Sequence, residues 1–243
     1  MKQYRSDSRK ISYGIVMGGA LFLLYEGLRR ALMPDTGLDN GAAVWLKTLI
    51  YAFPDGPLYT AIAVLVVGAV LLVRDYKQGL RIRADFLALA GFESLFWALT
   101  LFFGLGWLAP LIVPPAELTM NTAPGSRRWI EDVIMSLGAG FYEELFFRLL
   151  LVGLLQGAFW FVGRDPQSPF NIVTVVLTAS VLFSLAHFKF VIGEYGDDFS
   201  YYRFFFRTLF GVAMSALLVA RGFGITAWAH ALYDVLVFTV RAI

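Results

Sequence analysis

Seven apolar segments, separated by polar or turn-forming residues, are the feature that most constrains the fold of this chain. A helix needs about 20 mostly apolar residues to cross the hydrocarbon core of a bilayer. The composition agrees, because 58% of the residues are hydrophobic and the mean hydropathy is +0.68. The sequence therefore predicts an all-α, polytopic membrane helix bundle of about seven transmembrane helices. The segments are 12–32, 58–73, 86–113, 129–162, 172–192, 204–220 and 225–240.

We interpret residues 1–243 as a single membrane domain. The basic tail 1–10 resembles the start of a signal peptide, but no small-residue cleavage site follows, so an uncleaved first helix is expected. The segment 42–53 is too short to span a membrane and predicts an interfacial or re-entrant helix. The basic residues of the tail and of loop 74–83 favour a cytoplasmic N-terminus. We expect a multi-pass protein of the plasma (inner) membrane.

Charge and cysteine counts narrow the function classes. The 20 basic and 18 acidic residues leave a net charge of +2, so no nucleic-acid partner is indicated. The chain contains no cysteine, which removes disulfides, thiolate catalysis and Cys-type metal sites. The expected partners are the lipid bilayer and a protein or peptide substrate that is itself membrane-associated.

Three ionisable residues interrupt the apolar run 137–161, namely Glu143, Glu144 and Arg148. Insertion scales assign about 2.5–3.5 kcal/mol to each charged residue at the centre of a membrane helix. Three such residues within two turns of one membrane helix therefore indicate a functional site. The only two histidines of the chain, His187 and His230, also lie in apolar runs. Together these residues predict a polar site inside the bilayer.

The spacing of these residues places them in pairs on helix faces. Residues four apart on a helix are neighbours, so Glu144 can pair with Arg148 while Glu143 points elsewhere, toward a cavity. The same spacing joins His230 to Asp234, whose carboxylate can hold one ring nitrogen and fix the tautomer. It also relates Phe183 to His187. We expect Glu143, His187 and His230 to converge on one cavity near the middle of the membrane.

The order Glu143-Glu144-x-x-x-Arg148, Phe183-x-x-x-His187 and His230-x-x-x-Asp234 resembles the CPBP family of CAAX proteases and bacteriocin-processing (Abi-type) enzymes. The resemblance covers residues 130–240, the expected catalytic core, and leaves 1–128 as N-terminal helices. Members of this family are polytopic intramembrane proteases. The resemblance therefore implies peptide-bond hydrolysis within a membrane helix bundle.

The resemblance also implies a role for each matched residue. Glu143 and His187 would activate the attacking water, and Glu144 and Arg148 would form a supporting ion pair. His230 and position 234 would stabilise the oxyanion. Asp234 stands where many members have Asn, and because an ionised Asp cannot donate a hydrogen bond, we assign it to orienting His230.

Two questions stay open on the sequence. The first is the cofactor, which is either none or zinc; if zinc is bound, the expected ligands are Glu143, His187 and His230. The second is function. The leading hypothesis is an endopeptidase that cleaves near the C-terminus or membrane anchor of a substrate protein. The alternatives are a non-catalytic scaffold or immunity protein of the same fold and a proton-coupled transporter.

Overall fold

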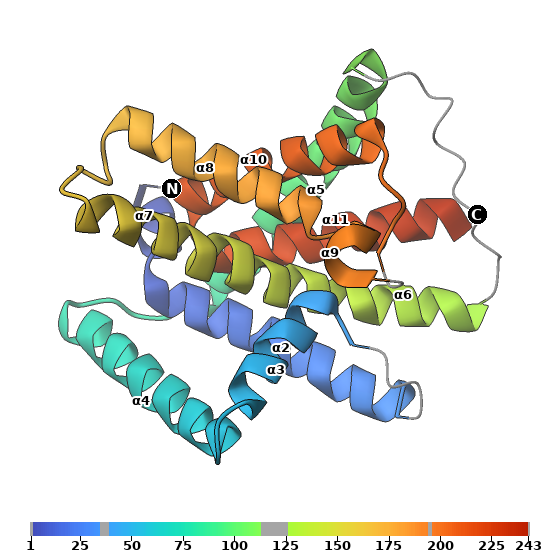
Figure 1. The fold of residues 1–243 in the computed structure, drawn as a ribbon. Coiled ribbons are helices and arrows are strands. Elements are labelled where there is room, and N and C mark those ends of the chain that lie inside the picture. The colour runs from blue at the N-terminus through green and yellow to red at the C-terminus, as the bar shows by residue number, and fades with distance from the viewer. Residues whose placement is uncertain (1, 35–38, 113–125, 194–195, 243) are drawn as a thin grey trace.

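The computed structural model describes residues 2–34, 39–112, 126–193 and 196–242. Within these ranges every regular element is a helix (Figure 1), which confirms the predicted all-α membrane bundle. The helices are α1 (Lys2–Asp7), α2 (Ile11–Leu32), α3 (Gly41–Tyr51), α4 (Gly56–Lys77), α5 (Ala84–Ile112), α6 (Ser126–Gly138), η2 (Ala139–Leu151), α7 (Val152–Phe161), α8 (Pro169–Leu185), α9 (Lys189–Ile192), α10 (Tyr201–Arg221) and α11 (Phe223–Ala242).

Six of the seven predicted segments are helices long and apolar enough to cross a membrane among the described residues. The seventh, α8, has 17 residues, which gives a length of about 25 Å against a hydrocarbon core of about 30 Å. The predicted segment 172–192 was therefore too long at its C-terminal end. The chain leaves the helix after Leu185, and the backbone of His187 accepts a hydrogen bond of 2.9 Å from the N–H of Asp197.

Helix α11 lies at the centre of the bundle and packs against α2, α5, α6, η2 and α10. Helix α4 lies at the edge beside α2 and α3 (Figure 1). The short helix predicted over 42–53 is α3, which packs against η2. Helix α11 and the first part of η2 therefore carry many buried residues, while α4 presents most of its surface outward.

The N-terminal helix α1 is fixed to the bundle by a buried polar network. The Tyr4 hydroxyl donates to Glu93 of α5 at 2.6 Å, and the Arg221 guanidinium at the end of α10 donates to the same carboxylate at 2.7 Å. Burial and the adjacent Glu93 carboxylate raise the pKa of Tyr4 to about 12. The hydroxyl therefore remains a donor at neutral pH. This contact ties the first helix to α5 and α10.

The helix 129–162 predicted from the sequence is continuous, but its central part, η2, is wound as a π-helix. Such windings are rare and occur often at functional sites. At this level η2 approaches α11 closely, because Gly140 has no side chain. A Cβ atom at Gly140 would lie 2.5 Å from the Ala227 carbonyl oxygen and 2.8 Å from the Ala231 nitrogen.

Gly140 and Gly153 lie on the same continuous helix and offer a matched test of this approach. Gly140→Ala forces η2 and α11 apart and should destabilise the protein by about 1–3 kcal/mol, the usual cost of overpacking. Gly153→Ala meets no atom within 4 Å and is exposed, so it should be neutral or slightly stabilising. Thermal unfolding in detergent measures both. Equal melting temperatures for the two variants would contradict this packing.

Candidate active site

The structure brings all six sequence-predicted site residues together from three parts of the chain. Helix η2 carries Glu143, Glu144 and Arg148; the end of α8 is followed by His187; and α11 carries His230 and Asp234. Contacts of 4 Å or less link these six side chains into one cluster.

Glu143 lies between the two imidazoles. Its Oε2 atom is 3.7 Å from Nε2 of His187 and 3.9 Å from Nε2 of His230. Its other oxygen, Oε1, accepts a hydrogen bond of 3.0 Å from the side-chain amide of Asn40. The separations from the imidazoles are too long for direct hydrogen bonds, but a polar atom could bridge them. One oxygen of Glu143 is therefore held, and the other faces both histidines.

Glu144 is fully buried and binds two partners through a single oxygen. Its Oε1 atom accepts a hydrogen bond of 2.7 Å from Nδ1 of His230 and lies 3.3 Å from Nη1 of Arg148. The predicted Glu144–Arg148 pair is thus present in the geometry, and Glu144 has an additional contact. The Arg148 guanidinium also lies 4.2 Å from the centre of the Phe183 ring. This arrangement compensates a buried charge with an ion pair and a cation–π contact.

The orientation of His230 differs from the one expected from its spacing to Asp234. Asp234 Oδ2 lies 3.5 Å from Nε2, whereas Glu144 binds Nδ1 at 2.7 Å. Glu144 is therefore the closer partner that orients the ring, and Asp234 faces the opposite nitrogen. The sequence analysis assigned Asp234 to orienting His230 because of their spacing within one helix. Such spacing carries no information about a contact from another helix, such as that of Glu144.

A backbone contact fixes which nitrogen of the His187 ring carries the proton. Its Nδ1 atom lies 2.7 Å from the carbonyl oxygen of Phe183 and must be the protonated nitrogen, since a carbonyl only accepts. In the neutral ring Nε2 is then an acceptor, and it faces Glu143. The His187 side chain is 28% exposed, against 3% for His230. The cluster is therefore more open on the His187 side.

Asn40 was missed by the sequence analysis. It precedes α3 as the N-terminal cap, with its side-chain oxygen accepting from the N–H groups of Ala42 and Ala43. An Asn before a short apolar helix is a recognisable cap signal. Its contact with Glu143, 103 residues away in the sequence, has no local signal.

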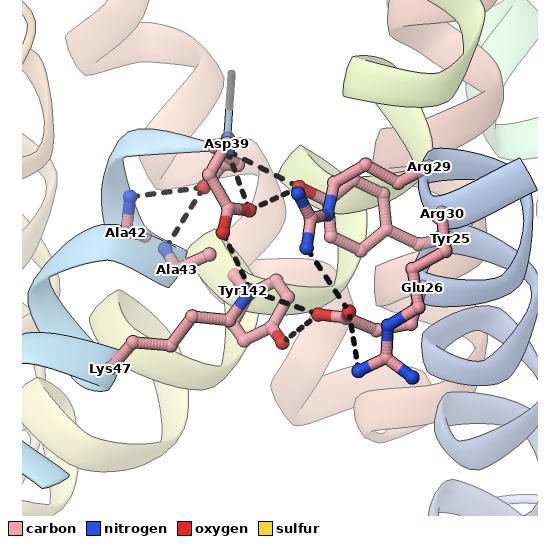
Figure 2. A network of polar contacts seen from close by, with 10 residues as sticks. Tyr25, Glu26, Arg29, Arg30, Asp39, Ala42, Ala43, Lys47 and Tyr142 are labelled. Carbon is pink, nitrogen blue, oxygen red and sulfur yellow. Dashed lines mark hydrogen bonds and ion pairs between the residues drawn. The ribbon is translucent and has the colours of Figure 1, made fainter. Parts of the chain in front are cut away.

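Figure 2 shows the polar network next to Asn40, which joins α2, α3 and η2. Lys47 donates to Asp39 at 2.6 Å and to Glu26 at 3.0 Å, and the Tyr142 hydroxyl donates to Glu26 at 2.8 Å. Burial raises the pKa of the Asp39 carboxyl, but hydrogen bonds from Lys47 and Tyr25 outweigh it and hold the pKa below its usual value. The carboxylate is therefore ionised at neutral pH, and its stabilising contacts are lost only as the pH falls through that lowered pKa.

The choice between no cofactor and zinc bound by Glu143, His187 and His230 stays a prediction. In the part of the chain that the structure describes, no group of three or more His, Asp or Glu side chains could hold a metal ion. Nε2 of His230 faces the carboxylates of both Glu143 and Asp234, which suits a hydrogen-bond donor at this nitrogen. We assign no step of the chemistry to a metal.

Comparison with known proteins gives one match. Residues 126–236 match the family model described as type II CAAX prenyl endopeptidase Rce1-like. The matched segment contains η2, α8, α10 and most of α11, and with them all six predicted site residues. Asn40 and the network of Figure 2 lie largely outside it. No curated protein and no solved structure matches the chain.

Arg148 offers a test of the buried ion pair. Arg148→Ala leaves Glu144 as a buried carboxylate without its cation, which should cost about 3–5 kcal/mol of stability. Arg30 is a matched control, because it pairs with Glu26 at the same i, i+4 spacing but is 76% exposed. Arg30→Ala should therefore cost at most about 1 kcal/mol. Chemical or thermal unfolding in detergent measures both variants.

A stable but inactive Arg148→Ala variant would indicate another role for the guanidinium. Neither terminal nitrogen of Arg148 has a hydrogen-bond partner among the described residues. If the variant is as stable as the wild type but functionally dead, the guanidinium acts on a bound molecule rather than on Glu144. That result would contradict the structural role.

Proposed function

We propose that this chain, whose residues 126–236 match the family model of the Rce1-like type II CAAX prenyl endopeptidases, hydrolyses a peptide bond in a membrane-associated protein. The match to this family model and the apolar helices support a CAAX-type intramembrane protease that crosses the membrane several times. The finer proposal is cleavage near the C-terminus or membrane anchor of the substrate, in the plasma membrane. The observation that supports hydrolysis is the Glu143 oxygen that faces Nε2 of both histidines.

The nucleophile is a water molecule between Glu143 and His187. Both Oε2 of Glu143 and the unprotonated Nε2 of His187 are hydrogen-bond acceptors, 3.7 Å apart. Two acceptors at this distance are compatible with a water that donates one proton to each. The lone pairs of its oxygen are then free to attack a carbonyl carbon. Glu143 is the general base, and His187 orients the water.

The oxyanion is stabilised by His230. Carboxylates lie on both sides of its ring, Glu144 at Nδ1 and Asp234 at Nε2, so a proton on either ring nitrogen faces an acceptor. Its Nε2–H can donate to the developing negative oxygen. Asp234 lies beside the Nε2 atom of His230 and does not itself donate to the oxyanion. An Asp can fill this place because the donor is supplied by His230.

The reaction balances with these groups alone. Water forms a bond to the carbonyl carbon and passes a proton to Glu143, while the π electrons of the carbonyl move to its oxygen. When the tetrahedral intermediate collapses, the C–N bond breaks and Glu143 returns the proton to the leaving nitrogen. The products are a new carboxyl terminus and a new amino terminus.

The first prediction from this mechanism concerns Glu143 and His187. Groups that act on one water fail together, so Glu143→Gln and His187→Ala should each abolish nearly all cleavage, and the double variant should be little worse. His230→Ala should be less severe, with a loss of about 10²–10³ in kcat for one oxyanion donor. The assay is cleavage of fluorogenic C-terminal prenylated peptides by purified protein in lipid nanodiscs.

A stability control accompanies this test, because Glu143→Gln preserves shape and should melt like the wild type. If that variant cleaves at close to the wild-type rate, both the assignment and the family-based mechanism are wrong. If the wild type binds a partner protein but cleaves none of the peptides, a non-catalytic scaffold is favoured instead.

Metal dependence gives a second prediction. We expect purified, active protein to carry well below one zinc per chain and to keep its activity after chelation and dialysis. Elemental analysis and cleavage on the same sample measure both quantities. Stoichiometric zinc, together with loss of activity on chelation and recovery on zinc addition, would overturn the metal-free mechanism.

A further inference from the structure

We propose that Asn40, which lies outside the family-matched segment, is a positioning residue for the general base Glu143, and that the network of Figure 2 fixes Asn40 for this purpose. The inference rests on the proposed function and adds to it a residue from the N-terminal helices. It predicts that catalysis by the C-terminal half depends on the start of α3.

The orientation of the Asn40 amide is determined by its partners. Its oxygen faces the backbone N–H groups of Ala42 and Ala43 at 3.0 and 3.3 Å. These groups only donate, and the Glu143 carboxylate only accepts, so the oxygen and nitrogen cannot be exchanged. The helix cap therefore turns Nδ2 toward Glu143, which it contacts at 3.0 Å. Asn40 itself is 7% exposed.

This hydrogen bond selects the reactive oxygen of Glu143. With Oε1 engaged by Asn40, Oε2 is the oxygen that faces His187 and His230. A carboxylate without this restraint could rotate and lose its alignment with the water. Misplacement of a catalytic group by about 1 Å can cost about a hundredfold in rate.

The surrounding network holds Asn40 from three helices (Figure 2). The Asn40 backbone N–H lies 3.3 Å from the Tyr25 hydroxyl of α2 and 3.1 Å from the Asp39 carboxylate. Lys47 of α3 binds Asp39 and also Glu26, which connects the start of α3 to α2. Tyr142 of η2, directly before Glu143, donates to Glu26. The network therefore fixes both Asn40 and the helix that carries the base.

The competing explanation is that Asn40 only caps α3. Asn, Asp and Ser are about equally good caps, but only Asn has an amide that can donate to Glu143 while its oxygen caps the helix. Asn40→Asp keeps the acceptor and loses the donor, with a new charge near Glu143. Asn40→Ser keeps the acceptor without a charge, and its shorter side chain withdraws the donor from Glu143. Asn40→Ala removes both the cap and the donor.

The experiment compares kcat, KM and melting temperature for these three variants in the prenylated-peptide assay. We expect Asn40→Ser and Asn40→Asp to lower kcat by about ten- to a hundredfold, the worth of a hydrogen bond to a charged group. KM should stay unchanged, and Asn40→Ser should melt close to the wild type. Asn40→Ala should lower both kcat and the melting temperature. A pure capping role predicts wild-type kcat for the Ser and Asp variants and would overturn the inference.

Lys47 tests the network independently. Lys47→Met should lower kcat in the wild-type background but add little in the Asn40→Ser background, because the network acts through Asn40. The exposed Lys77 at the end of α4 is the matched control, and Lys77→Met should leave kcat unchanged. Additive losses for Lys47→Met and Asn40→Ser would show that the network does not act through Asn40.

The outcomes separate this inference from the function on which it rests. If the wild type cleaves and Glu143→Gln does not, while Asn40→Ser retains full kcat, the proposed function stands and the inference is wrong. If the wild type cleaves none of the peptides, the proposed function fails, and the role of Asn40 fails with it.

Discussion

The burial of Glu144 and Arg148 is the constraint on which the rest of the site depends. Both side chains are almost completely removed from solvent, and an isolated charge in such a place is strongly unfavourable. Their mutual contact of 3.3 Å, the His230 hydrogen bond and the Phe183 ring compensate this cost. Because these partners come from η2, α8 and α11, the charge compensation fixes the three elements relative to one another. The position of His230 follows from that arrangement.

The same kind of contact holds the other helices. Apolar burial gives little preference between helix neighbours in a bilayer, because lipid is as apolar as leucine; close packing and polar contacts between helices provide the specificity. Asp75 of α4 accepts a hydrogen bond of 2.7 Å from Ser12 of α2, and Arg221 of α10 binds Glu93 of α5. At the crossing of η2 and α11 the absence of a side chain at Gly140 allows close packing. Polar pairs and small residues thus set the geometry in which the site is assembled.

The sequence predicted those features that are encoded locally. Long apolar runs indicated the membrane helices, and the i, i+4 spacings placed Glu144 beside Arg148 and His230 beside Asp234. The family resemblance is confirmed over residues 126–236. The roles of the individual site residues stay predictions, since geometry alone does not measure catalysis.

What the sequence could not predict depends on contacts between distant segments. Helix α8 ends at Leu185, where the chain turns and the backbone beyond it hydrogen-bonds to Asp197; hydrophobicity alone continues to residue 192. The bond from His230 to Glu144 spans 86 positions, and that from Asn40 to Glu143 spans 103. No periodicity within one helix carries information about either contact. Tertiary packing decides them.

The two adjacent glutamates illustrate how such packing divides their roles. Glu144 has no exposed surface, and one of its oxygens is shared by a cation and an imidazole. Both contacts use this carboxylate as the acceptor, so Glu144 is engaged in holding Arg148 and His230. Glu143 is 12% exposed at its side chain, with one oxygen held by a neutral amide and the other facing two imidazoles without a direct hydrogen bond. A proton can reach that oxygen and leave it again without breaking a direct hydrogen bond. Of the two neighbours, Glu143 is therefore the one whose surroundings permit it to act as a base.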